Sequence, residues 1–112
     1  MRIYKILARL DWEAARAEGT YRGSGVDRHD GYIHFSSAEQ VAETAQRHFA
    51  GQSDLVVLEV EAAGLGPALR WEPSRGGQLF PHLYAPLDPA RVRRVLEAPL
   101  GPDGAPQVDL GK

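Results

Sequence analysis

DLVVLEVE, residues 54–61, is the strongest strand signal in the chain. Its central positions are apolar one after another, so both faces of a strand built from them would be apolar. That pattern is typical of a strand buried in the middle of a sheet. We therefore expect the sheet of this protein to be organised around residues 54–61.

Shorter segments on both sides of this strand predict further strands. Residues 3–8 are β-branched and aromatic at their start and alternate in polarity. The remaining predicted strands cover residues 32–35, 69–72, 82–85 and 92–97. Two of these, residues 69–72 and 82–85, lie on either side of the Gly76-Gly77 pair, which favours a turn between them.

Two helices are predicted. The first covers residues 12–18, with Asp11 as its N-terminal cap and Gly19 at its end. The second begins at Ser36-Ser37, where two overlapping capping boxes are present, and runs to about residue 50. Its expected buried face, at helical spacing, consists of Ala38, Val41, Ala42, Ala45 and Phe49. Residues 20–31 contain three glycines and are expected to form a loop with room for one short strand.

The order of these elements indicates the fold class. There are too few helices for a doubly wound parallel sheet, so we predict a single compact α+β domain, mostly antiparallel, with two helices. This domain is expected to cover residues 1–98. Residues 99–112 are rich in proline and glycine, and we expect a C-terminal tail without regular structure there.

Composition excludes several classes of function. The chain of 112 residues has a formal net charge of −2 with acids and bases interspersed, so it lacks the basic stripe that binds double-stranded nucleic acid. No apolar run approaches the roughly 20 residues of a membrane helix. The chain has no cysteine, and its first residues read as a strand and not as a signal peptide. We expect a cytoplasmic protein without membrane contact; the oligomeric state is left open.

The segment YIHFSS, residues 32–37, is the first candidate site. Strand alternation places Tyr32, His34 and Ser36 on one face and Ile33 and Phe35 on the other. The predicted helix that follows would present free backbone N–H groups, which favour an anion. We therefore expect this joint to contact a phosphate or a ribose hydroxyl. In the alternative interpretation, the two serines only cap the helix and His34 only decorates the sheet.

One edge of the predicted second helix extends this candidate site. Ser37, Thr44 and His48 share that edge, so Thr44 and His48 could reach the same cleft as His34. Alternatively, Thr44 bonds the carbonyl four residues before it and His48 is a surface residue without a role.

The segment RWEPSRGGQLFPHLY, residues 70–84, is the second candidate site. It contains two aromatic side chains that could form apolar walls, a carboxylate, and a guanidinium suited to phosphate or carboxylate. It also contains a glycine pair that would let the backbone approach a ligand closely, and two further polar rings. These candidates are Trp71, Phe80, Glu72, Arg75, Gly76, Gly77, His82 and Tyr84. In the alternative interpretation the segment is a structural hairpin, with Trp71 and Phe80 in the core and an ordinary ion pair between Glu72 and Arg75. The four histidines of the chain lack the spacing of a metal site, so no metal is expected.

Four blocks of the sequence resemble a known family of small bacterial proteins, domain of unknown function 952. The blocks are IYKI, DGYIHFSSAEQVAETAQRHFAG, DLVVLEV and LRWEPSRGGQLFPHLYAPL, within residues 3–96. That family is grouped by fold with the ADP-ribosyltransferase-like proteins. The wider class surrounds NAD with a first-strand basic residue or His, a strand-to-helix polar motif and a later acidic residue. Here the motif is matched by residues 34–37 and the acid by Glu72, whereas the first strand offers Tyr4-Lys5.

The resemblance implies a role for each candidate. NAD would be the substrate, with Glu72 stabilising the oxocarbenium-like ribose and His34 holding a ribose hydroxyl. Aromatic rings would stack on the ligand, and Arg75 with the Ser36-Ser37 turn would hold the pyrophosphate. We thus expect a nucleotide-like ligand and a transferase related to ADP-ribosyltransferases. The alternatives are a non-catalytic binding or regulatory module of the same fold, and a structural plug without a ligand.

Overall fold

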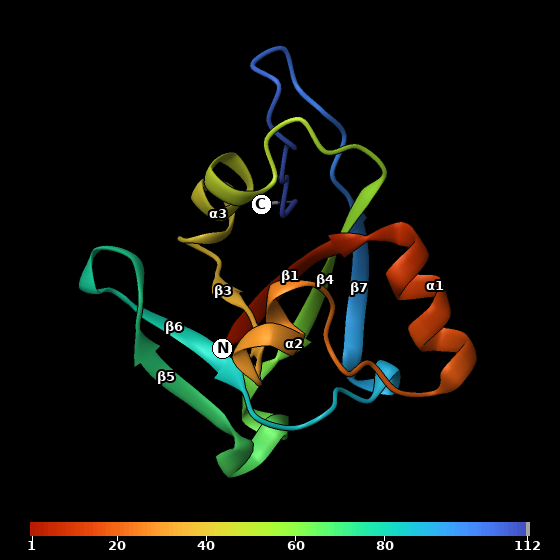
Figure 1. The fold of residues 1–112 in the computed structure, drawn as a ribbon, viewed down its shortest axis with the longest axis vertical. Coiled ribbons are helices and arrows are strands. Elements are labelled where there is room, and N and C mark those ends of the chain that lie inside the picture. Colours follow the sequence, from red (N-terminus) through yellow and green to blue (C-terminus); the bar gives the residue numbers. More distant parts are fainter. Residues whose placement is uncertain (112) are drawn as a thin grey trace.

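The computed structural model describes residues 1–111, apart from the side chain of Arg75, and contains two antiparallel sheets (Figure 1). The first has the strand order β3-β1-β4-β7 and the second the order β2-β6-β5. The strands of the first sheet are β1 (Arg2–Ala8), β3 (Ser36–Ser37), β4 (Leu55–Glu61) and β7 (Val92–Glu97). Those of the second are β2 (Ile33–His34), β5 (Leu69–Pro73) and β6 (Leu79–Leu83). The antiparallel α+β class predicted from the sequence is confirmed.

Three α-helices and three 3-10 turns connect these strands. The helices are α1 (Arg9–Glu18), α2 (Val26–Asp30) and α3 (Val41–His48). The turns are η1 (Ala62–Ala68), η2 (Arg75–Gly77) and η3 (Pro89–Arg91). The radius of gyration is 13.1 Å, close to that of a compact domain of this length.

Strand β4 is central, as its sequence predicts. It pairs along its full length with β1 and on its other side with β7. Positions 55–60 are all buried, because both faces of this sheet are covered. One face carries the core cluster of Ile3, Leu7, Val56 and Leu58, and the other carries the cluster of Tyr4, Ile6, Val57 and Ala45.

The chain changes sheets at Phe35. Ile33 and His34 pair with β6, whereas Ser36 and Ser37 pair with Tyr4 and Ile3 of β1. The prediction that the two serines begin a helix is therefore wrong. The long-range pairing with β1 outweighs their local preference for a helix cap.

Helix α3 starts later than the sequence predicts, at Val41. Half of the expected capping box survives, because Gln40 Oε1 accepts a hydrogen bond from the backbone N–H of Ser37 at 3.0 Å. Val41 and Ala45 face the core as expected, but Ala42 is exposed. The helix contacts the sheet along a narrower stripe than its apolar residues suggest.

The predicted loop of residues 20–31 contains the short helix α2, which corrects the expectation of a loop. Gly31, in the left-handed conformation, ends α2. Gly23 has a φ of 98°, and a Cβ there would lie 2.7 Å from the Cβ of Asp27. Only glycine allows the chain to pass so close to α2. The burial of Asp27 and its contacts outweigh the local preference of this glycine-rich segment for a loop.

The other element boundaries differ in smaller ways. Helix α1 ends at Gly19 as predicted, but it begins at Arg9, so Asp11 lies in its first turn and is not its cap. Strand β6 covers residues 79–83 and not 82–85, because it pairs with the whole of β5 across the turn.

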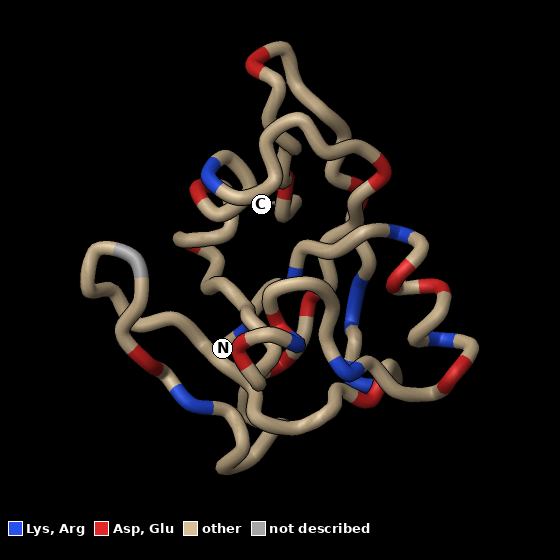
Figure 2. The backbone as a smooth tube through the Cα atoms, in the orientation of Figure 1, with Lys and Arg blue, Asp and Glu red and all other residues tan. Residues whose placement is uncertain are grey.

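The C-terminal residues have no helix or regular strand between positions 99 and 111. They nevertheless pack on the domain. Ala105 is buried, and Val108 and Leu110 contact the core cluster beneath α3. Basic and acidic positions are interspersed along the chain (Figure 2). No helix in residues 1–111 is long and apolar enough to cross a membrane.

Candidate functional site

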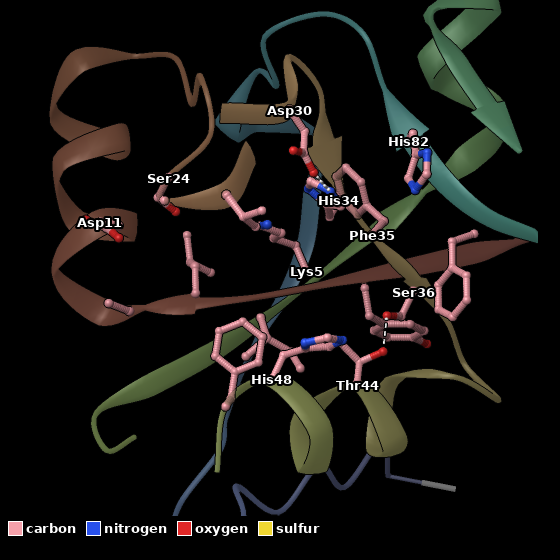
Figure 3. A pocket seen from close by; sticks show the side chains of 18 of the residues that line it. Lys5, Asp11, Ser24, Asp30, His34, Phe35, Ser36, Thr44, His48 and His82 are labelled. Carbon is pink, nitrogen blue, oxygen red and sulfur yellow. Dashed lines mark hydrogen bonds and ion pairs between the residues drawn. The ribbon is translucent and has the colours of Figure 1, made fainter. Parts of the chain in front are cut away.

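A cavity of about 630 Å³ lies where the chain passes from one sheet to the other (Figure 3). It is bounded by β1, the α2 segment, the β2–β3 joint, α3 and β6. Polar groups on its wall include His34, Ser36, Thr44, His48 and His82. Phe35, Phe49 and Phe80 supply apolar surface. This mixture of apolar walls and a few converging polar groups is typical of a small-molecule site.

One wall of the cavity is the open edge of β1, where five consecutive residues, 4–8, line the space. The backbone N–H of Arg9 donates to the carbonyl of Asp54 at 2.9 Å, just outside the pair Ala8–Leu55. In an antiparallel ladder this bond makes Ala8–Leu55 a non-hydrogen-bonded pair. By alternation, Ile6 also turns its backbone N–H and C=O away from β4.

The edge toward which Ile6 turns is the one that β3 covers only in part. Strand β3 pairs with Ile3 and Tyr4 and no further along β1. The N–H and C=O of Ile6 therefore point from the strand edge toward the cavity. A backbone donor and acceptor side by side can pair with an amide of a ligand, as they would with another strand.

Asp27 of α2 is the centre of the polar network behind this wall. Its Oδ2 lies 2.7 Å from Lys5 Nζ and accepts from the Ser24 backbone N–H at 3.1 Å and from Tyr21 Oη at 3.3 Å. Its Oδ1 lies 2.6 Å from His34 Nδ1 and accepts from the His34 backbone N–H at 3.0 Å. The side chains of Lys5 and Asp27 are 7% and 1% exposed, so this is a buried ion pair.

Burial and hydrogen bonding act in opposite directions on this pair. Burial alone would raise the pKa of Asp27, but the hydrogen bond from His34 and the charge of Lys5 hold that pKa well below its usual range. Burial also lowers the pKa of Lys5, and the attraction of Asp27 opposes that change. Asp27 is thus a fixed negative charge that anchors both β1 and the imidazole of His34.

His34 is held between two carboxylates. Its Nδ1 faces Asp27, and its Nε2 lies 2.9 Å from Oδ2 of Asp30. The hydrogen bond from His29, together with that from His34, lowers the pKa of Asp30. Both ring nitrogens can donate to ionised carboxylates only when the ring carries both protons. His34 and Asp30 therefore present a hydrogen-bonded pair to the cavity, with the ring held by a carboxylate at each nitrogen.

The opposite wall belongs to β3 and α3. Ser36 Oγ lies 2.9 Å from Thr44 Oγ1, which also donates to the carbonyl of Gln40 at 3.1 Å. Thr44 therefore lines the cavity and also bonds the carbonyl four residues before it. His48 lines the cavity one turn further along α3.

Comparison with known proteins now places the chain. Residues 6–95 match the family described as protein of unknown function, DUF952. The chain belongs to this family. The resemblance recognised in the sequence motifs is confirmed, and the family description assigns no activity. No curated protein matches the chain.

Solved structures with a similar fold and sequence are also known. The crystal structure of protein CC0527 from Caulobacter crescentus is 53% identical, with a TM-score of 0.93 over 96% of this chain and 94% of that one. The solution NMR structure of CC0527 is 54% identical, with a TM-score of 0.85 over 95% and 91% of the two chains.

The second predicted segment, residues 70–84, contributes only part of itself to the cavity. Phe80 and His82 line it, and Ser74 does so as well. Trp71 alternates to the other face of the hairpin and is 36% exposed. Gly76 and Gly77 form the exposed turn, with φ values of 67° and 78°. The predicted phosphate contact of Arg75 rests on a side chain outside the described part of the structure.

Glu72 and Tyr84 do not line the cavity, but they are connected to it through His82. Glu72 Oε1 lies 2.8 Å from His82 Nδ1 and accepts from Tyr84 Oη at 2.8 Å. The hydrogen bonds from His82 and Tyr84 lower the pKa of Glu72. Tyr32 stacks on the His82 ring at 4.2 Å. The two predicted segments therefore meet, at the His34–His82 pair of neighbouring strands. Ser37 is buried in β3, apart from the cavity lining.

Sequence reasoning missed Lys5, Asp27 and Asp30 as site residues. One signal was present, because a lysine in the middle of the apolar strand IYKILA needs a partner if it is buried. The partner's identity had no local signal, since Asp27 lies 22 positions away. No group of three or more His, Asp or Glu side chains in residues 1–111 is arranged to hold a metal ion.

Proposed function

We propose that the cavity binds a nucleotide-like small molecule, and that NAD is its substrate. The observation that carries this proposal is the open edge of β1, where Ile6 offers a backbone N–H and C=O to the cavity. A carboxamide presents the complementary acceptor and donor, and nicotinamide carries such a group on a flat aromatic ring.

The rest of the cavity supports a ligand of this kind. Its volume of about 630 Å³ falls within the usual range for small-molecule sites. Phe35 and Phe80 offer apolar surface for a ring, and Ser36 and the His34–Asp30 pair offer hydrogen bonds for ribose hydroxyls. A position between two antiparallel sheets also fits the ADP-ribosyltransferase-like arrangement implied by the family resemblance. A cytoplasmic location belongs to the same proposal.

Transfer of ADP-ribose is the narrower form of the proposal. In this reaction the bond between ribose C1′ and the nicotinamide nitrogen breaks, and its electron pair neutralises the pyridinium ring. The hydrogen-bonded His34–Asp30 pair would orient the ribose as positive charge develops on it, and the Asp30 carboxylate would stabilise that charge.

One observation favours binding without turnover as the second candidate function. The first-strand cation, Lys5, is already neutralised by Asp27, and Glu72 does not line the cavity. A module that binds the nucleotide and does not cleave it would retain the edge of β1 and the His34 pair.

Matched ligands test the proposal without altering the protein. We expect calorimetry to show NAD binding at micromolar to millimolar concentration. Nicotinic acid adenine dinucleotide should bind at least about 10-fold more weakly, because its carboxylate would place an acceptor against the Ile6 carbonyl. Equal affinity for the two dinucleotides would contradict the β1-edge assignment, and absence of binding by both at millimolar concentration would overturn the nucleotide proposal.

A pair of bulky substitutions locates the ligand. Val26 lines the cavity and is 59% exposed, whereas Leu10 is 77% exposed and lies outside its lining. Val26→Trp should weaken NAD binding at least about 10-fold, and Leu10→Trp should leave it unchanged. Release of nicotinamide from bound NAD, followed by chromatography, then separates the transferase from the binding module.

A further inference from the structure

The two histidines that face each other across β2 and β6 differ in their hydrogen bonds. Both ring nitrogens of His34 form hydrogen bonds to carboxylates, those of Asp27 and Asp30. In His82 only Nδ1 does so, to the carboxylate of Glu72. Because the pKa of Glu72 is lowered and its carboxylate accepts, Nδ1 of His82 must carry the proton in this bond. In the uncharged ring, Nε2 of His82 is then a bare acceptor.

The Nε2 atom of His82 opens to the cavity. His82 is only 3% exposed, and no hydrogen bond joins its Nε2 to another described residue. Every side-chain nitrogen or oxygen sealed from solvent within the described residues has a partner. Nε2 is therefore in contact with solvent space, and the cavity is the space that His82 lines (Figure 3).

The surroundings of His82 hold its ring in one orientation. Tyr32 stacks on it at 4.2 Å, and the His34 ring meets it edge-on at 5.4 Å. Tyr84 donates to the same Glu72 oxygen that faces Nδ1, which fixes the carboxylate. Arg70, the cross-strand partner of His82, lies over the Tyr84 ring at 4.8 Å. A carboxylate behind an imidazole selects the tautomer and steadies the ring when it accepts a proton.

We propose that His82 is the proton acceptor of this cavity and that Glu72 acts through it, as a positioning residue and not in contact with the ligand. This assignment changes the role that the sequence suggested for Glu72. The role of His82 toward a reacting ligand rests on the proposed function. The tautomer of the His82 ring does not depend on any ligand.

The step that His82 would assist can be written with NAD and a hydroxyl acceptor or water. The acceptor oxygen forms a bond to ribose C1′ as the bond from C1′ to the nicotinamide nitrogen breaks. Its proton passes to Nε2 of His82, and the leaving electron pair stays on the nicotinamide. The imidazolium that results is stabilised by the adjacent Glu72 carboxylate.

Nitrogen NMR of the ligand-free protein, labelled with ¹⁵N in its histidines, tests the assignment directly. In the uncharged ring we expect His82 to carry its proton on Nδ1 and to have a bare Nε2. Glu72→Ala should shift the ring toward the Nε2–H tautomer, and the exposed control Glu39→Ala should leave it unchanged. A proton on Nε2 of the wild-type ring would overturn the proposal, as would an unaltered tautomer in folded Glu72→Ala.

A turnover assay sharpens the same test if NAD is cleaved. His82→Ala should lower kcat by about 10²- to 10⁴-fold with a small change in KM. Glu72→Ala should lower kcat less, and Glu72→Asp should restore part of it. If the wild type does not bind NAD, the proposed function is wrong, but the NMR result on the His82 tautomer still holds. Failure of the proposed function can thus be told apart from failure of the tautomer assignment.

Discussion

The two faces of the sheet around β1 and β4 each bury one charged side chain, and they treat it differently. On the face that carries Ile3 and Leu7, Lys5 and Asp27 are both buried, at 7% and 1% exposure. On the other side, Glu59 is 1% exposed, but its partners Arg2 and Arg94 are 46% and 42% exposed. The first pair is buried at both ends, and the second keeps its cations at the surface.

This difference has consequences for stability and for function. Water can replace a lost arginine partner at the surface, but the Asp27 carboxylate is only 1% exposed and water cannot easily take its place beside Lys5. The Lys5–Asp27 pair is connected through His34 to Asp30 at the cavity. The Glu59 network is connected to the C-terminal segment, because Arg94 donates to the Leu110 carbonyl at 3.0 Å. The charged pair that is buried at both ends therefore lies beside the candidate site.

Breaking the Lys5–Asp27 pair should have the largest effect on the free energy of unfolding. Asp27→Asn leaves Lys5 buried without a counter-charge, and we expect a loss of about 3–5 kcal/mol in the free energy of unfolding. Urea denaturation measures it. Glu13→Gln is the matched surface control, because the Glu13–Arg16 pair is exposed, and it should cost less than about 0.5 kcal/mol. A loss below 1 kcal/mol in Asp27→Asn would show that water reaches Lys5 after all.

Lowering the pH should remove the stabilisation by the Lys5–Asp27 pair more gradually. The pKa of Asp27 is lowered in the folded protein, so its contribution is fully present above the unfolded pKa of about 3.9. That contribution is lost as the pH falls through the folded pKa. Melting temperatures measured from pH 7 to pH 2.5 should fall more steeply for the wild type than for Asp27→Asn. Other carboxylates with lowered pKa values act in both proteins, so parallel curves would contradict the assignment to Asp27.

Opening the Glu59 network should have the smallest effect of the three. Arg94→Gln removes one exposed partner from Glu59 and the bond to Leu110, and Arg2 and Tyr4 still contact the carboxylate. We expect a loss in the free energy of unfolding well below that of Asp27→Asn, because water can replace the exposed guanidinium. Hydrogen exchange should quicken at positions 98–111 and stay unchanged around His34. Faster exchange at His34 would mean that the two faces are coupled, against the separation described above.

Several elements could be predicted from the sequence because their signals are local. The apolar run of β4, the alternation of β1 and the glycine after α1 each act within a few residues. The YIHFSS and RWEPSRGGQLFPHLY segments also stood out, and the structure brings them together at His34 and His82. Residue type and spacing were sufficient to locate the two segments.

The arrangement of the site could not be predicted, since it depends on contacts between distant positions. The pairing of Ser36 with Tyr4 converts an expected helix cap into a strand and leaves the edge of β1 open beyond it. The register of β5 against β6 turns Trp71 to the face opposite Glu72 and His82, and it places His82 between Glu72 and the cavity.

By itself, the sequence determined the family, the antiparallel α+β class, the central strand and the two segments that build the site. Tertiary structure alone decided that Lys5 meets Asp27, that His34 lies between two carboxylates and that Glu72 reaches the cavity only through His82. The physical reason is that periodicity sets which face of an element is buried. A charged side chain finds its partner only after those faces have packed.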